Sequence, residues 1–143
     1  MATILLIEDV PDLGLYEAGL LEAQGHRVIR CGGAPSPLAA CSLLRFGHCP
    51  LPDVADLIVF STALYTPTRH RTYRGMDLLS AYRRHPVYGR IPMLVVTIGA
   101  PRDIEGRSAI EFVEKFSPPR EILAAVGRLL DPARAKVGAR PTE

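Results

Sequence analysis

The sequence predicts an α/β fold: a doubly wound, five-stranded parallel sheet of strand order 2-1-3-4-5. Three observations support this prediction. Short apolar runs alternate along the 143-residue chain with segments of helical periodicity. Three runs are apolar throughout, which is typical of strands buried on both faces, and two alternate polar with apolar residues, which is typical of sheet edges. Strands that alternate with helices favour right-handed crossovers and a parallel sheet covered on both sides.

The predicted strands span residues 4–7, 26–31, 57–60, 93–96 and 110–113. The runs ILLI, LIVF and MLVV are too short for helices and contain no polar residue, so they predict the three central strands. HRVIRC and IEFV alternate, so they predict the edge strands, which are second and fifth along the chain.

The first predicted helix runs from Pro11 to about Gln24. It begins with Pro11 and Asp12 and ends before Gly25, residues that favour a helix start and a helix stop. We expect its apolar face, toward the sheet, to carry Leu13, Tyr16 and Leu20.

Two further helices are predicted. One runs from Met76 to about Arg84, and the other begins near Ser117 and Pro118 and ends before Pro132. Their expected inward residues are Leu78, Leu79 and Tyr82 in the former, and Ile122, Leu123, Val126, Leu129 and Leu130 in the latter.

Length and composition indicate one domain over residues 1–131, followed by a disordered tail or the start of a linker at 132–143. The net charge of +2 gives no case for a nucleic-acid or membrane partner. The apolar run at the N-terminus is too short for a signal peptide or a membrane span, so we expect a cytoplasmic protein.

Polar side chains follow the predicted strands where the strands end. Glu8 and Asp9 follow the first, Ser61 the third, Thr97 the fourth and Lys115 the fifth. Because the carboxyl ends of parallel strands meet at one edge of the sheet, we expect these groups to converge.

This constellation resembles the receiver domain of bacterial two-component response regulators. ILLIEDVPDL is similar to the opening strand of that family with its acidic pair, and IPMLVVT is similar to its fourth strand with its hydroxyl residue. EFVEKFSPPREIL is similar to its fifth strand, with a switch aromatic at Phe112, then the lysine and the last helix. The resemblance extends to about Leu130 and implies a flavodoxin-like receiver fold that serves phosphorelay signal transduction.

The resemblance also implies a chemistry for these positions. In the family a carboxylate at the end of the third strand accepts a phosphoryl group, and the acidic pair, here Glu8 and Asp9, holds Mg²⁺. Lysine and threonine, here Lys115 and Thr97, bind the phosphoryl oxygens, and movement of the threonine draws the aromatic inward.

Ser61 occupies the phosphoacceptor position of this pattern. Neither Asp53 nor Asp56 can replace the missing aspartate, because both precede the strand. A hydroxyl nucleophile needs an adjacent base, and the sequence places none nearby except the acidic pair itself. We therefore expect a vestigial pocket with no catalytic residue and no required cofactor, in which Glu8 and Asp9 bind Mg²⁺ weakly at best and more readily pair with Lys115.

Two residues next to the pocket also depart from the family. Ile98 follows Thr97 where the family usually has a small residue, and Phe116 follows Lys115 where it usually has proline. We expect both side chains to block the pocket. Thr97 and Ser61 are also compatible with ordinary hydrogen-bonded residues at strand ends, and Phe112 with fixed packing.

A basic loop between the third strand and the second helix supplies three candidate partner-binding residues, Arg69, Arg71 and Arg74. Such a loop suits an acidic protein or the phosphates of a nucleic acid. It is equally compatible with a solvated surface loop.

The leading hypothesis is an atypical receiver domain that is not an enzyme and acts, independently of phosphorylation, through protein–protein interaction. Its expected partner is a signalling protein such as a kinase or an output protein, and a homodimer remains open. The alternative is a nucleic-acid-associated regulator that uses the basic loop, residues 66–74. An enzyme with a hydroxyl nucleophile at Ser61 is least favoured.

Overall fold

The computed structural model describes residues 1–31, 43, 47, 49–61, 75–98 and 109–131. Within these ranges the chain forms five strands: β1 (Thr3–Ile7), β2 (Arg27–Cys31), β3 (Leu57–Phe60), β4 (Met93–Thr97) and β5 (Ile110–Glu114). The five predicted strands are confirmed, with bounds that differ by one residue at most. Polar residues or proline interrupt each apolar run before it is long enough for a helix, as Asp56 and Pro92 do before β3 and β4.

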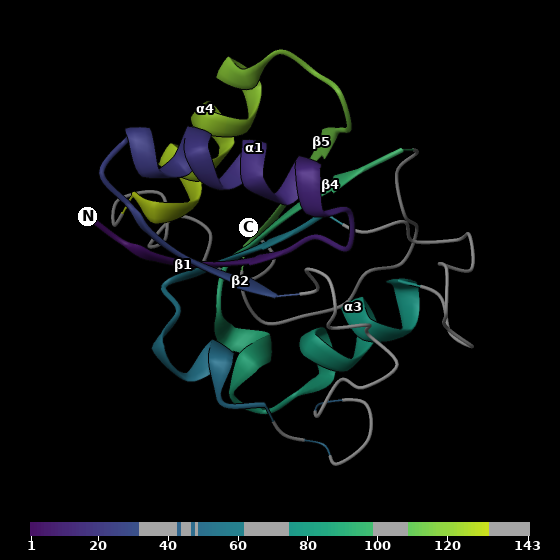
Figure 1. Ribbon diagram of the computed structural model, residues 1–143. Coiled ribbons are helices and arrows are strands. Elements are labelled where there is room, and N and C mark those ends of the chain that lie inside the picture. Colours follow the sequence, from purple (N-terminus) through teal and green to yellow (C-terminus); the bar gives the residue numbers. More distant parts are fainter. Residues whose placement is uncertain (32–42, 44–46, 48, 62–74, 99–108, 132–143) are drawn as a thin grey trace, which may run out of the picture.

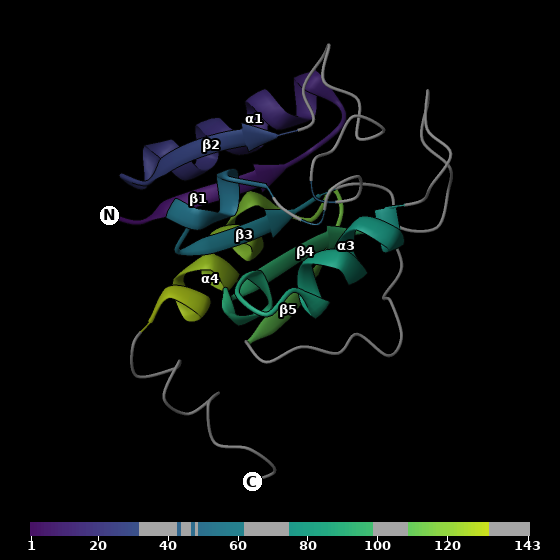
Figure 2. The same ribbon diagram turned by 90° about the horizontal axis from the view of Figure 1, so that it is seen from below.

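The sheet is parallel throughout and has the order β2-β1-β3-β4-β5, as predicted. Figure 2 shows the strands running in the same direction. Every residue of β3 and β4 is buried, whereas β2 and β5 contain exposed positions, which confirms their placement at the two edges. The carboxyl ends of β1 and β3 lie side by side, with Ile7 paired to Phe60.

Three helices cover the sheet in the described ranges: α1 (Pro11–Ala23), α3 (Gly75–Arg84) and α4 (Pro119–Leu130). Figure 1 shows α1 and α4 on one face of the sheet and α3 on the other. Short 3-10 helices lie at Leu51–Val54 and Tyr88–Arg90. Among the described residues, no helix has the length and apolar character that crossing a bilayer requires.

Each face of the sheet has its own apolar core. On the α1 and α4 face, the core includes Leu6, Val59, Val96, Ala18, Leu21, Ile122, Val126 and Leu129. On the α3 face, it includes Ile7, Phe60, Val95, Leu78, Leu79, Tyr82 and Tyr88. The inward residues predicted for α3 are confirmed, and those predicted for α4 are buried or half-buried.

The inward face predicted for α1 is wrong. Tyr16 is exposed, and Leu13 and Leu20 are only half-buried. The buried residues of the helix are Gly14, Glu17, Ala18 and Leu21. The small residues Gly14 and Ala18 lie on this buried face, and a Cβ atom on Gly14 would lie 2.8 Å from the Arg30 guanidinium. As a result, Glu17 points toward the strands.

Gly89 packs too closely against Arg83 to carry a side chain. A Cβ atom at this position would lie 2.5 Å from the backbone oxygen of Arg83, and backbone cannot move aside as a flexible side chain can. We expect Gly89→Ala to lower the free energy of unfolding by about 1–3 kcal/mol, as other overpacked sites do. Urea denaturation measures the change.

Gly127→Ala is the matched control for this prediction. A Cβ atom on Gly127 would meet no atom within 4 Å, and the residue lies inside α4. We expect this variant to be more stable than wild type by up to about 1 kcal/mol, because alanine favours the helix. Equal effects of the two substitutions would contradict the packing argument for Gly89.

Several predictions fall outside the described residues. They concern Arg69, Arg71 and Arg74, the rest of loop 66–74, and the tail 132–143. These stay predictions from the sequence.

Candidate functional site

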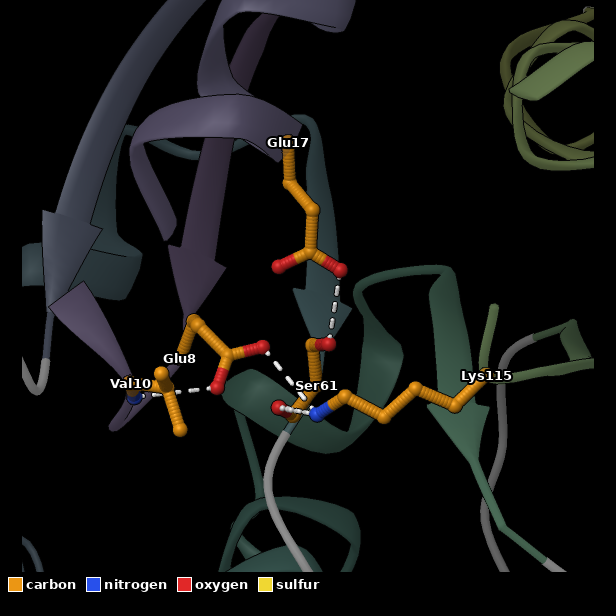
Figure 3. Close-up of polar contacts among 5 residues, drawn as sticks. All are labelled: Glu8, Val10, Glu17, Ser61 and Lys115. Atoms are coloured by element: carbon orange, nitrogen blue, oxygen red, sulfur yellow. Dashed lines mark hydrogen bonds and ion pairs between the residues drawn. The ribbon is translucent and has the colours of Figure 1, made fainter. Parts of the chain in front are cut away.

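The ends of the strands bring the predicted site residues to one edge of the sheet. The Ser61 N–H donates to the carbonyl oxygen of Ile7 at 2.8 Å, which fixes the end of β3 beside the end of β1, where Glu8 follows. The Lys115 N–H donates to the carbonyl oxygen of Thr97, also at 2.8 Å, and so places the lysine backbone beside the end of β4. Figure 3 shows Glu8, Ser61 and Lys115 converging at this edge.

Lys115 follows the edge strand β5, and its side chain reaches across the carboxyl ends of the strands to Glu8 and Ser61. Its Nζ lies 3.2 Å from Glu8 Oε2 and donates to the carbonyl oxygen of Ser61 at 2.9 Å. The Lys115 and Glu8 side chains are 12% and 1% exposed. The other carboxylate oxygen of Glu8 accepts the Val10 N–H at 3.1 Å. The predicted pairing of Glu8 with Lys115 is therefore confirmed, and Phe116 in place of proline does not keep the lysine away.

Glu17 is a site residue that the sequence reasoning missed. Its Oε2 accepts the hydroxyl hydrogen of Ser61 at 2.8 Å (Figure 3). Glu17 is 6% exposed and Ser61 is fully buried. Glu17 Oε1 is buried too and has no hydrogen-bond partner among the residues that the structure describes. The available signal was the spacing of the small residues Gly14 and Ala18 around Glu17, which marks the side of the helix that approaches the sheet.

The surroundings of Glu17 change its charge. Burial above all, and then the neighbouring Glu8, raise the pKa of its carboxyl from the ordinary 4.5 to about 8. The Ser61 hydroxyl and the Lys115 charge lower this pKa, but by less. At neutral pH, Glu17 is therefore mostly protonated, and the positive charge of Lys115 stands opposite the negative charge of Glu8.

We expected Ile98 and Phe116 to block the pocket, and this expectation is wrong. They are 70% and 75% exposed, so both side chains lie mostly in solvent at the rim of the strand ends. Phe116 has a φ of 68°, a left-handed conformation that is uncommon for an aromatic residue. Glu17, which reaches Ser61 from α1, is the residue that its buried hydroxyl contacts.

The remaining predicted residues occupy the expected elements. Thr97 ends β4 and is buried, and its hydroxyl lies 3.5 Å from the carbonyl oxygen of Ile98. Asp9 is half-buried in the turn before α1, and Phe112 lies exposed on the edge strand β5. Asp56 lies at the amino end of β3, whereas Ser61 follows its carboxyl end. There its carboxylate accepts the Thr3 N–H at 2.8 Å, so it cannot substitute for an acceptor at Ser61.

The donor groups at this edge do not fit Mg²⁺. Both Glu8 oxygens already accept from Lys115 and Val10, and β3 offers a hydroxyl where a hard carboxylate ligand is needed. Among the described residues, no group of three or more histidine, cysteine or acidic side chains is arranged to hold a metal ion.

Comparisons with known proteins connect this fold to receiver domains. No protein-family model and no curated protein matches the chain. The signal receiver domain of a signal transduction histidine kinase from Syntrophus aciditrophicus matches with a TM-score of 0.62 and 21% identity, over 100% of this chain and 96% of that one.

Two further structures match in the same way. The CheY-like response regulator receiver domain protein from Methanospirillum hungatei JF-1 has a TM-score of 0.63 and 21% identity, over 96% of this chain and 99% of that one. The chemotaxis protein CheY4 from Vibrio cholerae has a TM-score of 0.61 and 22% identity, over 91% and 99%. At these identities the likeness shows the fold, which is the flavodoxin-like fold of CheY-like receiver domains.

Proposed function

We propose that this chain is an atypical receiver domain of a two-component or phosphorelay system that does not accept a phosphoryl group. It acts instead through protein–protein interaction, with a signalling protein such as a kinase or an output protein as its partner. The observation that carries this proposal is Ser61, which stands at the end of β3, is fully buried, and is hydrogen-bonded to Glu17.

The chemistry around Ser61 opposes phosphoryl transfer. A serine hydroxyl attacks phosphorus only when a base removes its proton. Glu17 does contact the hydroxyl, which corrects the expectation that no base other than the acidic pair lies nearby. The raised pKa of Glu17 leaves it mostly protonated at neutral pH, and a protonated carboxyl cannot act as that base. A phosphodonor also cannot reach a buried oxygen, so a hydroxyl-nucleophile enzyme is not favoured.

The ammonium of Lys115 is already paired with a carboxylate of the pocket, that of Glu8. Lys115 pairs with Glu8 and bonds the Ser61 carbonyl, so its ammonium is engaged where a receiver would offer it to a phosphoryl oxygen. A domain arranged in this way has no open position for the signal that switches an ordinary receiver. This supports a role in which the domain binds its partner through a surface that phosphorylation does not change.

Phosphoryl transfer tests the proposal directly. When wild type is incubated with Mg²⁺ and radiolabelled acetyl phosphate, we expect no more label than on Ser61→Ala, because Ser61 is buried and lacks a base. An ordinary receiver domain serves as the positive control. Label that wild type acquires and Ser61→Ala does not would refute the proposed function.

A further inference from the structure

Glu17 and Ser61 come from distant parts of the chain. They are 44 residues apart in sequence and meet with Glu17 Oε2 2.8 Å from Ser61 Oγ. The strand end that lacks a carboxylate therefore contacts a carboxyl supplied by α1 (Figure 3). Glu8 and Lys115 complete the same buried cluster.

We propose that Glu17 keeps this site closed, and that phosphoryl acceptance can be restored only by changing Ser61 and Glu17 together. Its carboxyl replaces, in space, the carboxylate that β3 lacks. This inference rests on the proposed function, because it explains why the pocket of a receiver fold is unreactive.

Geometry gives the first reason. An aspartate at position 61 carries its carboxylate oxygens one bond beyond the position of the serine oxygen. That serine oxygen already lies at hydrogen-bond distance from Glu17, and its whole side chain is buried. The introduced carboxylate would therefore overlap Glu17 or turn away from the pocket.

Charge gives the second reason. With aspartate at position 61, three acidic groups would share one ammonium, that of Lys115, in a buried space. Carboxylic groups in contact share a proton, because two negative charges at that distance repel each other. A carboxylate that holds a proton is a poor nucleophile. Without Glu17, only two carboxylates, those of Glu8 and the introduced aspartate, would share the Lys115 ammonium.

Packing alone does not account for a carboxyl at position 17. An apolar side chain there would extend the core already formed by Ala18 and Leu21, whereas Glu17 leaves one buried oxygen without a hydrogen-bond partner in the described part of the chain. In the double variants Ser61 is replaced as well, so the loss of Glu17 leaves no buried hydroxyl without its acceptor. Variants at this position are therefore expected to fold.

The experiment compares Ser61→Asp, Ser61→Asp with Glu17→Val, and Ser61→Asp with Glu22→Ala in the full chain. Glu22 is an exposed acid on the same helix and supplies the matched control. Each protein is incubated with Mg²⁺ and radiolabelled acetyl phosphate. In the reaction, a carboxylate oxygen bonds to phosphorus, the phosphorus–oxygen bond to acetate breaks, and acetate leaves with the electron pair. The product is an acyl phosphate, which hydroxylamine cleaves.

We expect the Glu17→Val double variant to carry more hydroxylamine-sensitive label than Ser61→Asp by about tenfold or more, because only there is the nucleophile free. The Glu22→Ala double variant should match Ser61→Asp. Ser61→Asp with Glu17→Ala repeats the test with a smaller side chain, and amide spectra verify that each variant is folded.

Two outcomes would overturn the inference. Ser61→Asp alone could accept as much label as the Glu17→Val double variant, which would show that Glu17 does not close the site. Folded double variants could label no better than Ser61→Asp, which would show that the closure lies elsewhere. Label on wild type is a separate result, because it refutes the proposed function and not the comparison between the variants.

Discussion

Lys115→Met is expected to lower the free energy of unfolding by about 3 kcal/mol, because it leaves a buried carboxylate without its counter-ion. The Glu8 side chain is 1% exposed, and its Oε2 lies 3.2 Å from the lysine Nζ. The same substitution removes a hydrogen bond to the Ser61 carbonyl. Chemical denaturation at neutral pH measures the loss.

Arg128→Met supplies the control for this experiment. Arg128 forms an ion pair with Glu111 at 2.7 Å, but the arginine side chain is 47% exposed, so water screens the pair and its loss should cost far less. Adding Glu8→Gln to Lys115→Met should recover much of the stability, because the unpaired charge is gone. Equal losses for Lys115→Met and Arg128→Met would show that the Glu8 pair is not a buried one.

Wild type should lose stability relative to Glu17→Gln as the pH rises from about 4.5 to about 8. The folded-state pKa of Glu17 is raised from 4.5 to about 8, chiefly by burial and then by Glu8. Between these values the folded protein holds a proton that the unfolded chain has released. The free energy of unfolding therefore falls with rising pH, by at most about 1.4 kcal/mol per pH unit.

The comparison with Glu17→Gln isolates this group, because all other titrations are common to both proteins. Near pH 5 the neutral carboxyl and the amide should give similar stabilities. Above about pH 8 the variant should be the more stable protein by a few kcal/mol, since wild type then carries a second buried negative charge. Denaturation curves at several pH values test this, and a stability difference that does not change with pH would contradict it.

Local patterns were enough to predict the architecture. The four-residue runs LIVF and MLVV, bounded by Asp56 and Pro92, identify buried strands without any tertiary information, because their length excludes a helix and their composition excludes a surface. Once the strands alternate with helices, connection rules favour a parallel doubly wound sheet, and the alternating second and fifth strands take its edges, which indicates the order 2-1-3-4-5. The same rules bring Glu8, Ser61 and Lys115 to one edge, as the structure shows.

Two features of the site could not be predicted in this way. Ile98 and Phe116 follow pocket residues in sequence, yet their side chains lie mostly in solvent, because the direction a side chain takes after a strand end depends on the turn that follows. Glu17 escaped notice because the inward face of α1 was assigned to Leu13, Tyr16 and Leu20.

By itself, the sequence determined the strands and the serine at the end of β3, because each depends on residues close together in the chain. The polar alternation of the second and fifth strands placed them at the edges and so indicated the strand order. Only the tertiary structure decided what that serine meets. Apolar residues occur nearly all around α1, so periodicity favours no single face, and in the folded protein the helix is rotated so that Gly14, Glu17, Ala18 and Leu21 are buried. That rotation buries Glu17 against Ser61, across 44 residues of sequence.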